Sequence, residues 1–190
     1  MMKECNVFDF DGTLYRGDSS VDFYLYCLRH YPYIVFLLPT QIIGFLLYTL
    51  KLWNKTQMKR CFYYYLPLVP VEKALSAFWK GRLEQKIFPW YREIQSPTDV
   101  VVSASPEFLL APACKELGIQ TLIASRVNPR TGEYTGLNCG GEEKARRFQE
   151  QLPNVRIQAS YFDRDSDRFI SALAQEAFRI VDGKPHLEEL

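Results

Sequence analysis

The chain has 190 residues, enough for one or two domains of about 100 to 200 residues with a core of their own. Its 23 Lys and Arg nearly balance 22 Asp and Glu, so the net charge of +1 excludes a global field that would steer the chain onto nucleic acid. Aromatic residues make up 15% of the chain, a large share for a globular protein.

Cysteine and histidine usage narrows the chemistry. The five cysteines are odd in number and form no CxxC pair, which predicts reduced, buried thiols rather than a disulfide framework or a zinc knuckle. The chain has only two histidines, too few to favour a histidine-based catalytic triad or a metal site with several histidine ligands. We therefore expect the chemistry to depend on carboxylates. No basic segment followed by an apolar stretch and a cleavage site opens the chain, which predicts a cytoplasmic location.

Both ends of the chain predict an α/β fold. An apolar run at residues 4–10 predicts a buried strand that leads into a loop at 11–13. From Thr98 onward, β-rich runs alternate with amphipathic stretches, which is typical of a parallel sheet with helices on both faces. The expected strands are 98–103, 120–125, 156–162 and 177–181. The expected helices run from Ser105, as N-cap, to Gly118, then over 142–152 and 166–174, with a β-hairpin outside the core at 126–137.

The block between the first strand and the rest of the sheet has a different character. Residues 15–90 are predicted to be helical throughout, and they contain most of the aromatic surplus. We therefore expect an inserted all-helical cap at 15–90 and a Rossmann-like parallel sheet core formed by residues 1–14 and 91–190.

The cap contains a long apolar stretch at 31–53, with Lys51 as its only charge. It is long enough to cross a bilayer, but Pro32 and Pro39 interrupt a helix there. A single crossing would also separate the early acids from everything after residue 53. Three interpretations stay open: peripheral contact with the inner face of a membrane, the core or dimer face of a helical subdomain, and a true span. The basic residues that follow suit a lipid interface or a solvated surface, and are Lys51, Lys55, Lys59 and Arg60.

Acidic side chains follow the first predicted strand. Asp9 and Asp11 stand two residues apart, so both can face the crevice at the carboxyl end of a parallel sheet. One can attack as a nucleophile while the other exchanges a proton; a helix-capping pair is the alternative. Three more segments contribute polar groups at the same rim of the sheet, namely Ser103, Lys144, Asp163 and Asp167. A hydroxyl, a cation and a diacid in this order favour a catalytic site over unrelated caps and turns.

These residues give the chain its resemblance to the haloacid-dehalogenase superfamily of phosphatases, within the phosphoserine-phosphatase-like subfamily IB that has a helical C1-type cap after the first motif. The run Asp9-Phe10-Asp11-Gly12-Thr13-Leu14 is the specific part of the resemblance. Ser103-Ala104-Ser105 and the segment around Lys144 support it. The last motif departs from the family's usual Gly-Asp, because Phe162-Asp163 stands there, while the spacing from Asp163 to Asp167 is kept.

The resemblance implies a phosphomonoester hydrolase that acts through an aspartyl phosphate. Asp9 would be the nucleophile, and Asp11 would protonate the leaving oxygen and then activate water. The phosphate would be bound by Ser103, by Lys144 and by backbone amides near Gly12 and Ala104.

The resemblance also implies Mg²⁺. Four carboxylates against one lysine leave a charge of about −3, which a divalent cation would offset, and hard oxygen ligands select magnesium. The ion would be bound by Asp9, the Asp11 carbonyl and Asp163. Asp167 and Ser166 would support these ligands from behind.

The substrate is less constrained than the reaction. Asp18 stands where phosphoserine phosphatases have a glutamate that reads the substrate amine, but the cap offers no matching arginine for a carboxylate. Ile123-Ala124-Ser125 and residues 140–144 are similar to stretches of phosphatidylglycerophosphate phosphatase C-type members, which also have a hydrophobic cap. The expected partner is a phosphorylated small molecule or a lipid headgroup, and no nucleic acid. A soluble phosphoserine-like substrate and a phosphotransferase reaction stay as alternatives.

Overall fold

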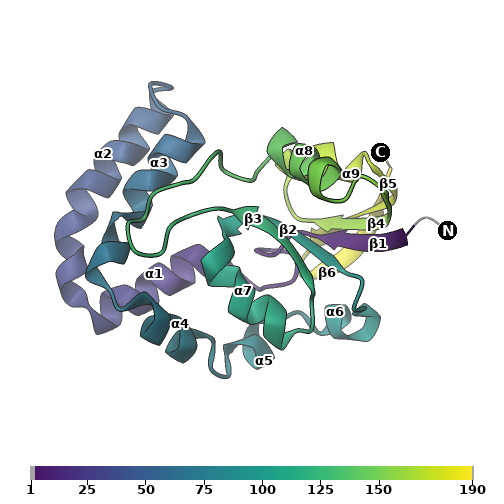
Figure 1. Ribbon diagram of the computed structural model, residues 1–190, viewed down its shortest axis with the longest axis horizontal. Helices are drawn as coiled ribbons and strands as arrows, with labels where there is room; N and C mark the ends of the chain where they lie inside the picture. The colour runs from purple at the N-terminus through teal and green to yellow at the C-terminus, as the bar shows by residue number, and fades with distance from the viewer. Residues whose placement is uncertain (1–2, 190) are drawn as a thin grey trace.

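The computed structural model describes residues 3–189 and is built on a six-stranded sheet in the order β3-β2-β1-β4-β5-β6 (Figure 1). The central strand β1 (Lys3–Phe8) lies between β2 (Val100–Pro106) and β4 (Val155–Phe162). Strands β1 to β5 are parallel, and β6 is antiparallel to β5. The outer strands are β3 (Thr121–Ser125), β5 (Ala174–Val181) and β6 (Lys184–Glu188). The carboxyl ends of β1, β2 and β4 therefore share one edge, as the sequence predicts.

Helices fill the chain between β1 and β2, a segment that we call the helical insertion (residues 19–94). Its α-helices and 3-10 helices are α1 (Ser19–His30), η1 (Pro32–Leu37), α2 (Leu38–Thr49), α3 (Lys55–Phe62), η2 (Tyr63–Leu68), α4 (Val71–Trp79), α5 (Arg82–Lys86) and α6 (Pro89–Ile94). The later helices are α7 (Glu107–Glu116), α8 (Glu142–Gln151), η3 (Asp165–Asp167) and α9 (Arg168–Ser171). The predicted α/β class and the helical character of the inserted block are confirmed.

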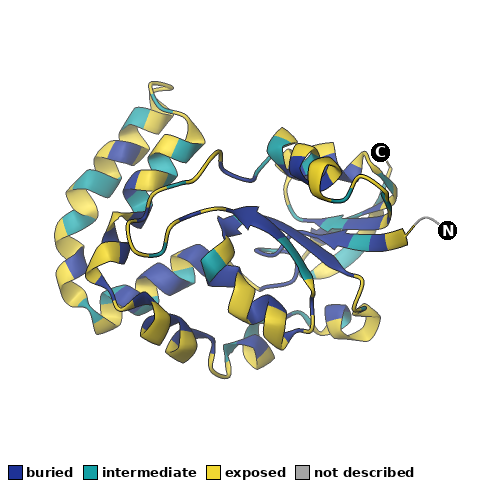
Figure 2. Cartoon of the chain, in the orientation of Figure 1, coloured by how far each residue is buried: buried dark blue, intermediate teal, exposed yellow. Residues whose placement is uncertain are grey.

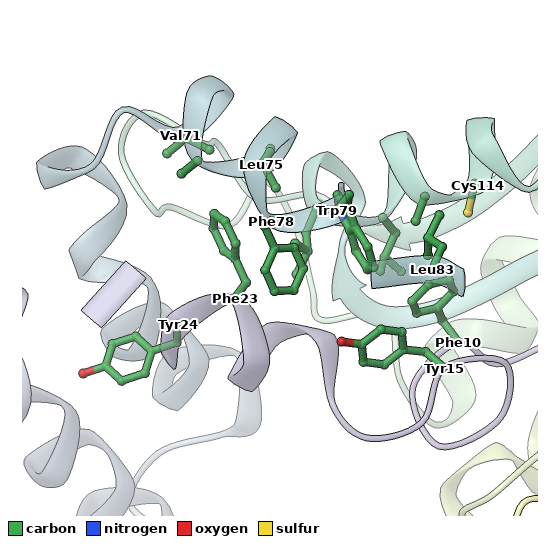
Figure 3. Packing of buried hydrophobic residues seen from close by; sticks show 14 of the residues in the cluster. Phe10, Tyr15, Phe23, Tyr24, Val71, Leu75, Phe78, Trp79, Leu83 and Cys114 are labelled. Atoms are coloured by element: carbon green, nitrogen blue, oxygen red, sulfur yellow. The ribbon is translucent and has the colours of Figure 1, made fainter. Parts of the chain in front are cut away.

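Two apolar cores lie on opposite faces of the sheet. Because neighbouring residues of a strand point to opposite faces, Val7 and Phe8 of β1 belong to different cores. The first core is closed by Phe148 of α8 and Ile170 of α9. The second is larger and continues into the helical insertion through a set of packed aromatic rings (Figure 3): Phe10, Tyr15, Phe23, Phe78 and Trp79. Since this core is shared, the boundaries of the cap at residues 14 and 91 stay a prediction.

Cysteines take part in the same packing. Cys5 and Cys139 belong to the smaller core, and Cys27 and Cys114 to the larger one. Cys61 is buried in the insertion, and all five thiols are free. The prediction of reduced, buried cysteines is confirmed.

Two predicted elements differ from the structure, and one strand was not predicted. Ser105 does not cap a helix, because β2 continues to Pro106 and α7 begins at Glu107. The helix predicted at 166–174 is confined to η3 and α9, since β5 begins at Ala174, where pairing with Ile157 of β4 overrides the local helix propensity. Strand β6 was not predicted because it has no apolar run, although the Asp-Gly turn that precedes it is a hairpin signal.

The predicted hairpin at 126–137 is present but reaches the core. Val127 and Tyr134 form an antiparallel bridge, and Val127 is buried in the larger core, contrary to the expectation of a peripheral loop. At the turn, Gly132 has a φ of +74°, and a Cβ there would overlap with the backbone carbonyl of Tyr63 at the start of η2. The turn of the hairpin therefore packs directly against the backbone of the helical insertion.

The apolar stretch at 31–53 forms η1 and α2, which follow each other with Pro32 and Pro39 at their starts. Within residues 3–189, Pro32–Thr49 is the one helical segment long and apolar enough to span a membrane, with a mean hydropathy of 1.5. Only 11% of it is buried (Figure 2), so the interpretation as a subdomain core is wrong. A single crossing also conflicts with the sheet, because β1 precedes the segment and its two neighbours follow it.

Substitution of Gly132 tests the packing between the hairpin and the helical insertion. Gly132→Ala should reduce the free energy of unfolding by about 2–4 kcal/mol, because the new Cβ adds a steric clash to the cost of a left-handed backbone. Gly81→Ala is the matched control: its φ is +69°, but no atom lies within 4 Å of the added Cβ, so a loss of about 1 kcal/mol is expected. If urea denaturation gave the same loss in the free energy of unfolding for both variants, the close contact between Gly132 and Tyr63 would be contradicted.

Candidate active site

The acids predicted near the two ends of the chain meet at the carboxyl edge of the sheet. Asp9 follows β1, and its amide donates a hydrogen bond to the carbonyl of Tyr161 in β4. Lys144 in the first turn of α8 is buried, and its Nζ lies 2.8 Å from Asp9 Oδ1 and 2.8 Å from Asp167 Oδ2. One cation therefore joins the end of β1 to the segment that follows β4.

Charge pairing outweighs burial at Lys144. Burial alone would lower the pKa of the ammonium group, but Asp9 and Asp167 raise it well above its ordinary value. Burial and the charge of Asp9 raise the pKa of Asp167, against the opposing effect of Lys144. Burial and Asp9 also raise the pKa of Asp163. Negative charge is thus in excess here, which favours a further cation.

A group of oxygens suited to that cation lies beside Lys144. Asp9, Asp163 and Asp167 each offer one carboxylate oxygen, and these atoms lie within 4.8 Å of one another. Asp163 Oδ1 is buried without a hydrogen-bond partner, which is unfavourable unless a cation binds it. Gly12 makes room for this carboxylate, because a Cβ at its φ of +78° would overlap with Asp163. Hard oxygen donors fit Mg²⁺.

Asp11 is held by its own hydrogen bonds. Its Oδ1 accepts from the amide of Ser19 at 2.6 Å, and its Oδ2 accepts from the hydroxyl of Ser105. Burial and the charge of Asp18 raise the pKa of Asp11 to about 7, although both hydrogen bonds favour the carboxylate. A carboxyl group with a pKa near neutrality can both donate and accept a proton under physiological conditions.

Three of the remaining predicted residues lie at the same edge. Ser103 is buried at the end of β2, and its Oγ accepts a hydrogen bond from the amide of Ser105 at 3.1 Å. The Ala104 carbonyl accepts from the hydroxyl of Ser125 at 3.0 Å. The Ser166 hydroxyl donates to Asp167 Oδ1 at 3.4 Å. The sequence prediction therefore placed these side chains in one region, while their contacts with a phosphate group stay a prediction.

Asp18 and Gly12 have structural roles besides those predicted. Asp18 is the N-cap of α1, because its Oδ1 accepts from the amides of Ser20 at 3.0 Å and Val21 at 3.1 Å. The amide of Gly12 donates to the carbonyls of Tyr15 and Gly17 within its turn. The observed contribution of Gly12 is thus its close approach to Asp163, and substrate selection by Asp18 stays a prediction.

One cation near the site was not predicted from the sequence. Lys59 of α3, interpreted above as part of a surface cluster, donates from Nζ to the Ala104 carbonyl at 2.9 Å. Burial and the positive charge of Lys55 lower the pKa of Lys59 to about 8, against the opposing effect of nearby acids that include Asp11. No local signal marks Lys59, because a lysine one helical turn from Lys55 looks like part of the same exposed face.

A row of hydroxyl groups that ends at Asp11 was also not predicted from the sequence. The Tyr63 hydroxyl donates to Ser20 Oγ at 3.0 Å, and Ser20 Oγ lies 3.0 Å from Ser105 Oγ. Since Ser105 donates its only hydroxyl proton to Asp11, Ser20 must donate to Ser105. The helical insertion thereby contacts Asp11 through three side chains in series. The residues come from three separate segments, and only the fold brings them together.

Comparisons with known proteins identify the family and the fold of the chain. A family model for haloacid dehalogenase-like hydrolases matches residues 7–168. Protein CicA of Caulobacter vibrioides is 38% identical over 93 residues, which are 45% of this chain and 42% of that protein, so the match spans less than half of either. A protein of unknown function from Bordetella pertussis Tohama I has a TM-score of 0.75 at 18% identity, with 94% of this chain and 90% of that chain covered. A phospho-aspartyl intermediate analogue of phosphoserine phosphatase has a TM-score of 0.56 at 16% identity, with 94% and 87% covered.

The acid cluster predicts a specific effect of Mg²⁺. The ion should raise the melting temperature of the protein, because only the folded state holds these oxygens together. Asp163→Asn should weaken Mg²⁺ binding in isothermal titration calorimetry by at least about tenfold. Asp165→Asn, in the same loop but with its side chain 76% exposed, should leave binding unchanged. Equal affinities for wild type and Asp163→Asn would exclude Asp163 as a ligand.

Proposed function

This chain belongs to the haloacid dehalogenase-like hydrolases, and we propose that it is a Mg²⁺-dependent phosphomonoester hydrolase that works through a phosphorylated Asp9. The observation that carries the proposal is the buried ammonium of Lys144, which lies 2.8 Å from Asp9 at the end of the central strand. A carboxylate paired in this way is fixed in direction, as a nucleophile requires. Asp11, two residues later, supplies the acid and base.

In the first step, a carboxylate oxygen of Asp9 attacks the phosphorus atom, and the bond from phosphorus to the ester oxygen breaks. The leaving oxygen takes the proton of Asp11, so that an alcohol departs and an acyl phosphate remains on Asp9. Lys144 and Ser103 would donate to phosphoryl oxygens, and such fixed donors favour the charge that develops in the transition state.

In the second step, Asp11 is a carboxylate and accepts a proton from water. The water oxygen attacks phosphorus, the bond to Asp9 breaks, and inorganic phosphate and the Asp9 carboxylate are released. Asp11 ends protonated, as it began. A divalent cation bound by Asp9, the Asp11 carbonyl and Asp163 would supply positive charge that offsets the repulsion between carboxylates and phosphate. The partnerless oxygen of Asp163 supports this assignment.

Replacement of the nucleophile tests the mechanism. Asp9→Asn should reduce kcat for p-nitrophenyl phosphate by at least about a thousandfold, since the amide cannot form the acyl phosphate. The fold should be retained, because an amide oxygen can still accept from Lys144. Acid-quenched wild type should contain a hydroxylamine-sensitive phosphate that Asp9→Asn lacks. Asp165→Asn serves as the control, and substantial turnover by Asp9→Asn would refute the role.

For the substrate, we propose a lipid headgroup phosphate such as that of phosphatidylglycerophosphate. Two observations support this choice over a small metabolite. The helical insertion exposes an apolar segment, Pro32–Thr49, of which only 11% is buried. Asp18, the candidate for binding a substrate amine, has one oxygen occupied in capping α1. An exposed apolar surface on the insertion suits an amphiphilic substrate better than a small polar one.

A phosphatase panel decides between the substrate classes. Phosphatidylglycerophosphate in mixed micelles should give a kcat/KM at least about a hundredfold above that of phosphoserine, which would correspond to about 2.7 kcal/mol of additional transition-state binding. A higher value for phosphoserine would favour the soluble small-metabolite reading. Transfer of phosphate to an added alcohol in place of water would identify a phosphotransferase.

A further inference from the structure

Helix α2 turns a polar and a small residue toward the protein and its large apolar residues toward solvent, the reverse of the usual arrangement in a surface helix. Gln41 points inward, where it accepts from the hydroxyl of Tyr24 at 2.9 Å and donates to the carbonyl of Phe62 at 3.2 Å. Gly44 is buried against Cys61 of α3, where a Cβ would come within 2.9 Å of the cysteine side chain. The helix is thus fixed in rotation by a polar and a small residue on its inner side. Its large apolar side chains are directed outward as a result.

The outward side chains form what we call the apolar face of η1 and α2. They are between 53% and 82% exposed, and are Phe36, Ile42, Ile43, Phe45, Leu46 and Leu50. Figure 2 shows this outer edge of the insertion mostly as exposed. Scattered exposed apolar residues are normal in soluble proteins, but a contiguous set on one helix marks an interaction surface.

The charge of the surrounding chain identifies the partner. Residues 23–71 contain five lysines and arginines and no aspartate or glutamate. Arg60 is paired with Glu133, and Lys59 is directed to the Ala104 carbonyl. Lys51 and Lys55 flank the end of α2 and are exposed. Among residues 3–189, neither of them forms an ion pair. An apolar face bordered by unpaired lysines complements a surface that is apolar inside and anionic at its rim.

We propose that the apolar face of η1 and α2 docks on an anionic lipid leaflet, with Lys51 and Lys55 at the level of the lipid phosphates. A second copy of the chain fits less well, because a two-fold contact would bring the same positive patch against itself. This inference deepens the proposed function, since it names the surface from which a lipid phosphate is reached, and it rests on that function for its purpose.

The same helical pair connects the apolar face to the active site. Helix α3 packs along α2 at Gly44 and carries Lys59, whose ammonium reaches the Ala104 carbonyl at the carboxyl edge of the sheet. Figure 1 shows α2 and α3 at the end of the molecule opposite to both chain termini. Docking through α2 would therefore place a headgroup beside α3 and leave the sheet in solvent. Binding along one leaflet also keeps β1 on the same side as its neighbours.

Vesicle flotation of the full chain tests the docking surface. The protein should float with vesicles of phosphatidylcholine and phosphatidylglycerol, and much less with phosphatidylcholine alone. Ile42→Asp and Phe45→Asp should each lower partitioning by at least about tenfold, since each replaces an apolar side chain that would enter the leaflet with a charged one. Lys51→Gln and Lys55→Gln should each lower it about fivefold on the anionic vesicles only. Leu187→Asp is the matched control, because Leu187 is 68% exposed but lies on β6.

A second measurement reports insertion directly. A Phe45→Trp variant should show a blue-shifted emission with anionic vesicles and quenching by brominated lipid tails. Absence of flotation and of quenching would overturn the proposal, and so would a dimer in analytical ultracentrifugation that Ile42→Asp dissociates. Hydrolysis of p-nitrophenyl phosphate by Ile42→Asp should equal that of wild type. A wild type that floats but hydrolyses no phosphomonoester would instead refute the proposed function while leaving the docking surface in place.

Discussion

The buried ammonium of Lys144 is the interaction on which the site depends. It lies 2.8 Å from a carboxylate at the end of β1 and 2.8 Å from another in η3, so it joins elements that no local contact would bring together. Two carboxylates at this depth would repel each other without it, and an ion pair broken on one side typically costs about 3–5 kcal/mol. The site is therefore assembled by an attraction that the folded sheet makes possible, and this attraction also brings the carboxylate oxygens of Asp9 and Asp167 together.

Packing of the helical insertion is the second condition for the site. The larger core is continuous from Phe8 of the central strand to Phe23 and Phe78 of the insertion. Many of the aromatic residues of the sequence lie in this shared core, where edge-to-face contacts between rings add to the stabilisation from buried apolar area. Asp11 lies where the two parts meet, which explains how its hydrogen bonds come from both β2 and α1.

Much of the fold and the centre of the site could be predicted from the sequence, for identifiable reasons. The Val triplet of β2 and the alternation of strands and helices carry a strong periodic signal, and parallel strands place Asp9, Lys144 and Asp163 at one edge. Strand β6 was not predicted because it has no apolar run, and the helix predicted at 166–174 was too long because pairing with β4 begins β5 at Ala174. The contacts of Lys59 and Tyr63 were not predicted for a related reason, because they depend on how the insertion is oriented against the sheet.

The row of hydroxyl groups from Tyr63 to Asp11 links the position of the helical insertion to the surroundings of Asp11. Each hydroxyl owns a single proton, and the two ends fix every donor to point toward the carboxyl group. An insertion placed elsewhere would break this row between Ser20 and Ser105 and would remove the amide of Ser19 from Asp11. The packing of the insertion against the sheet and the orientation of the Asp11 carboxyl group are therefore set together.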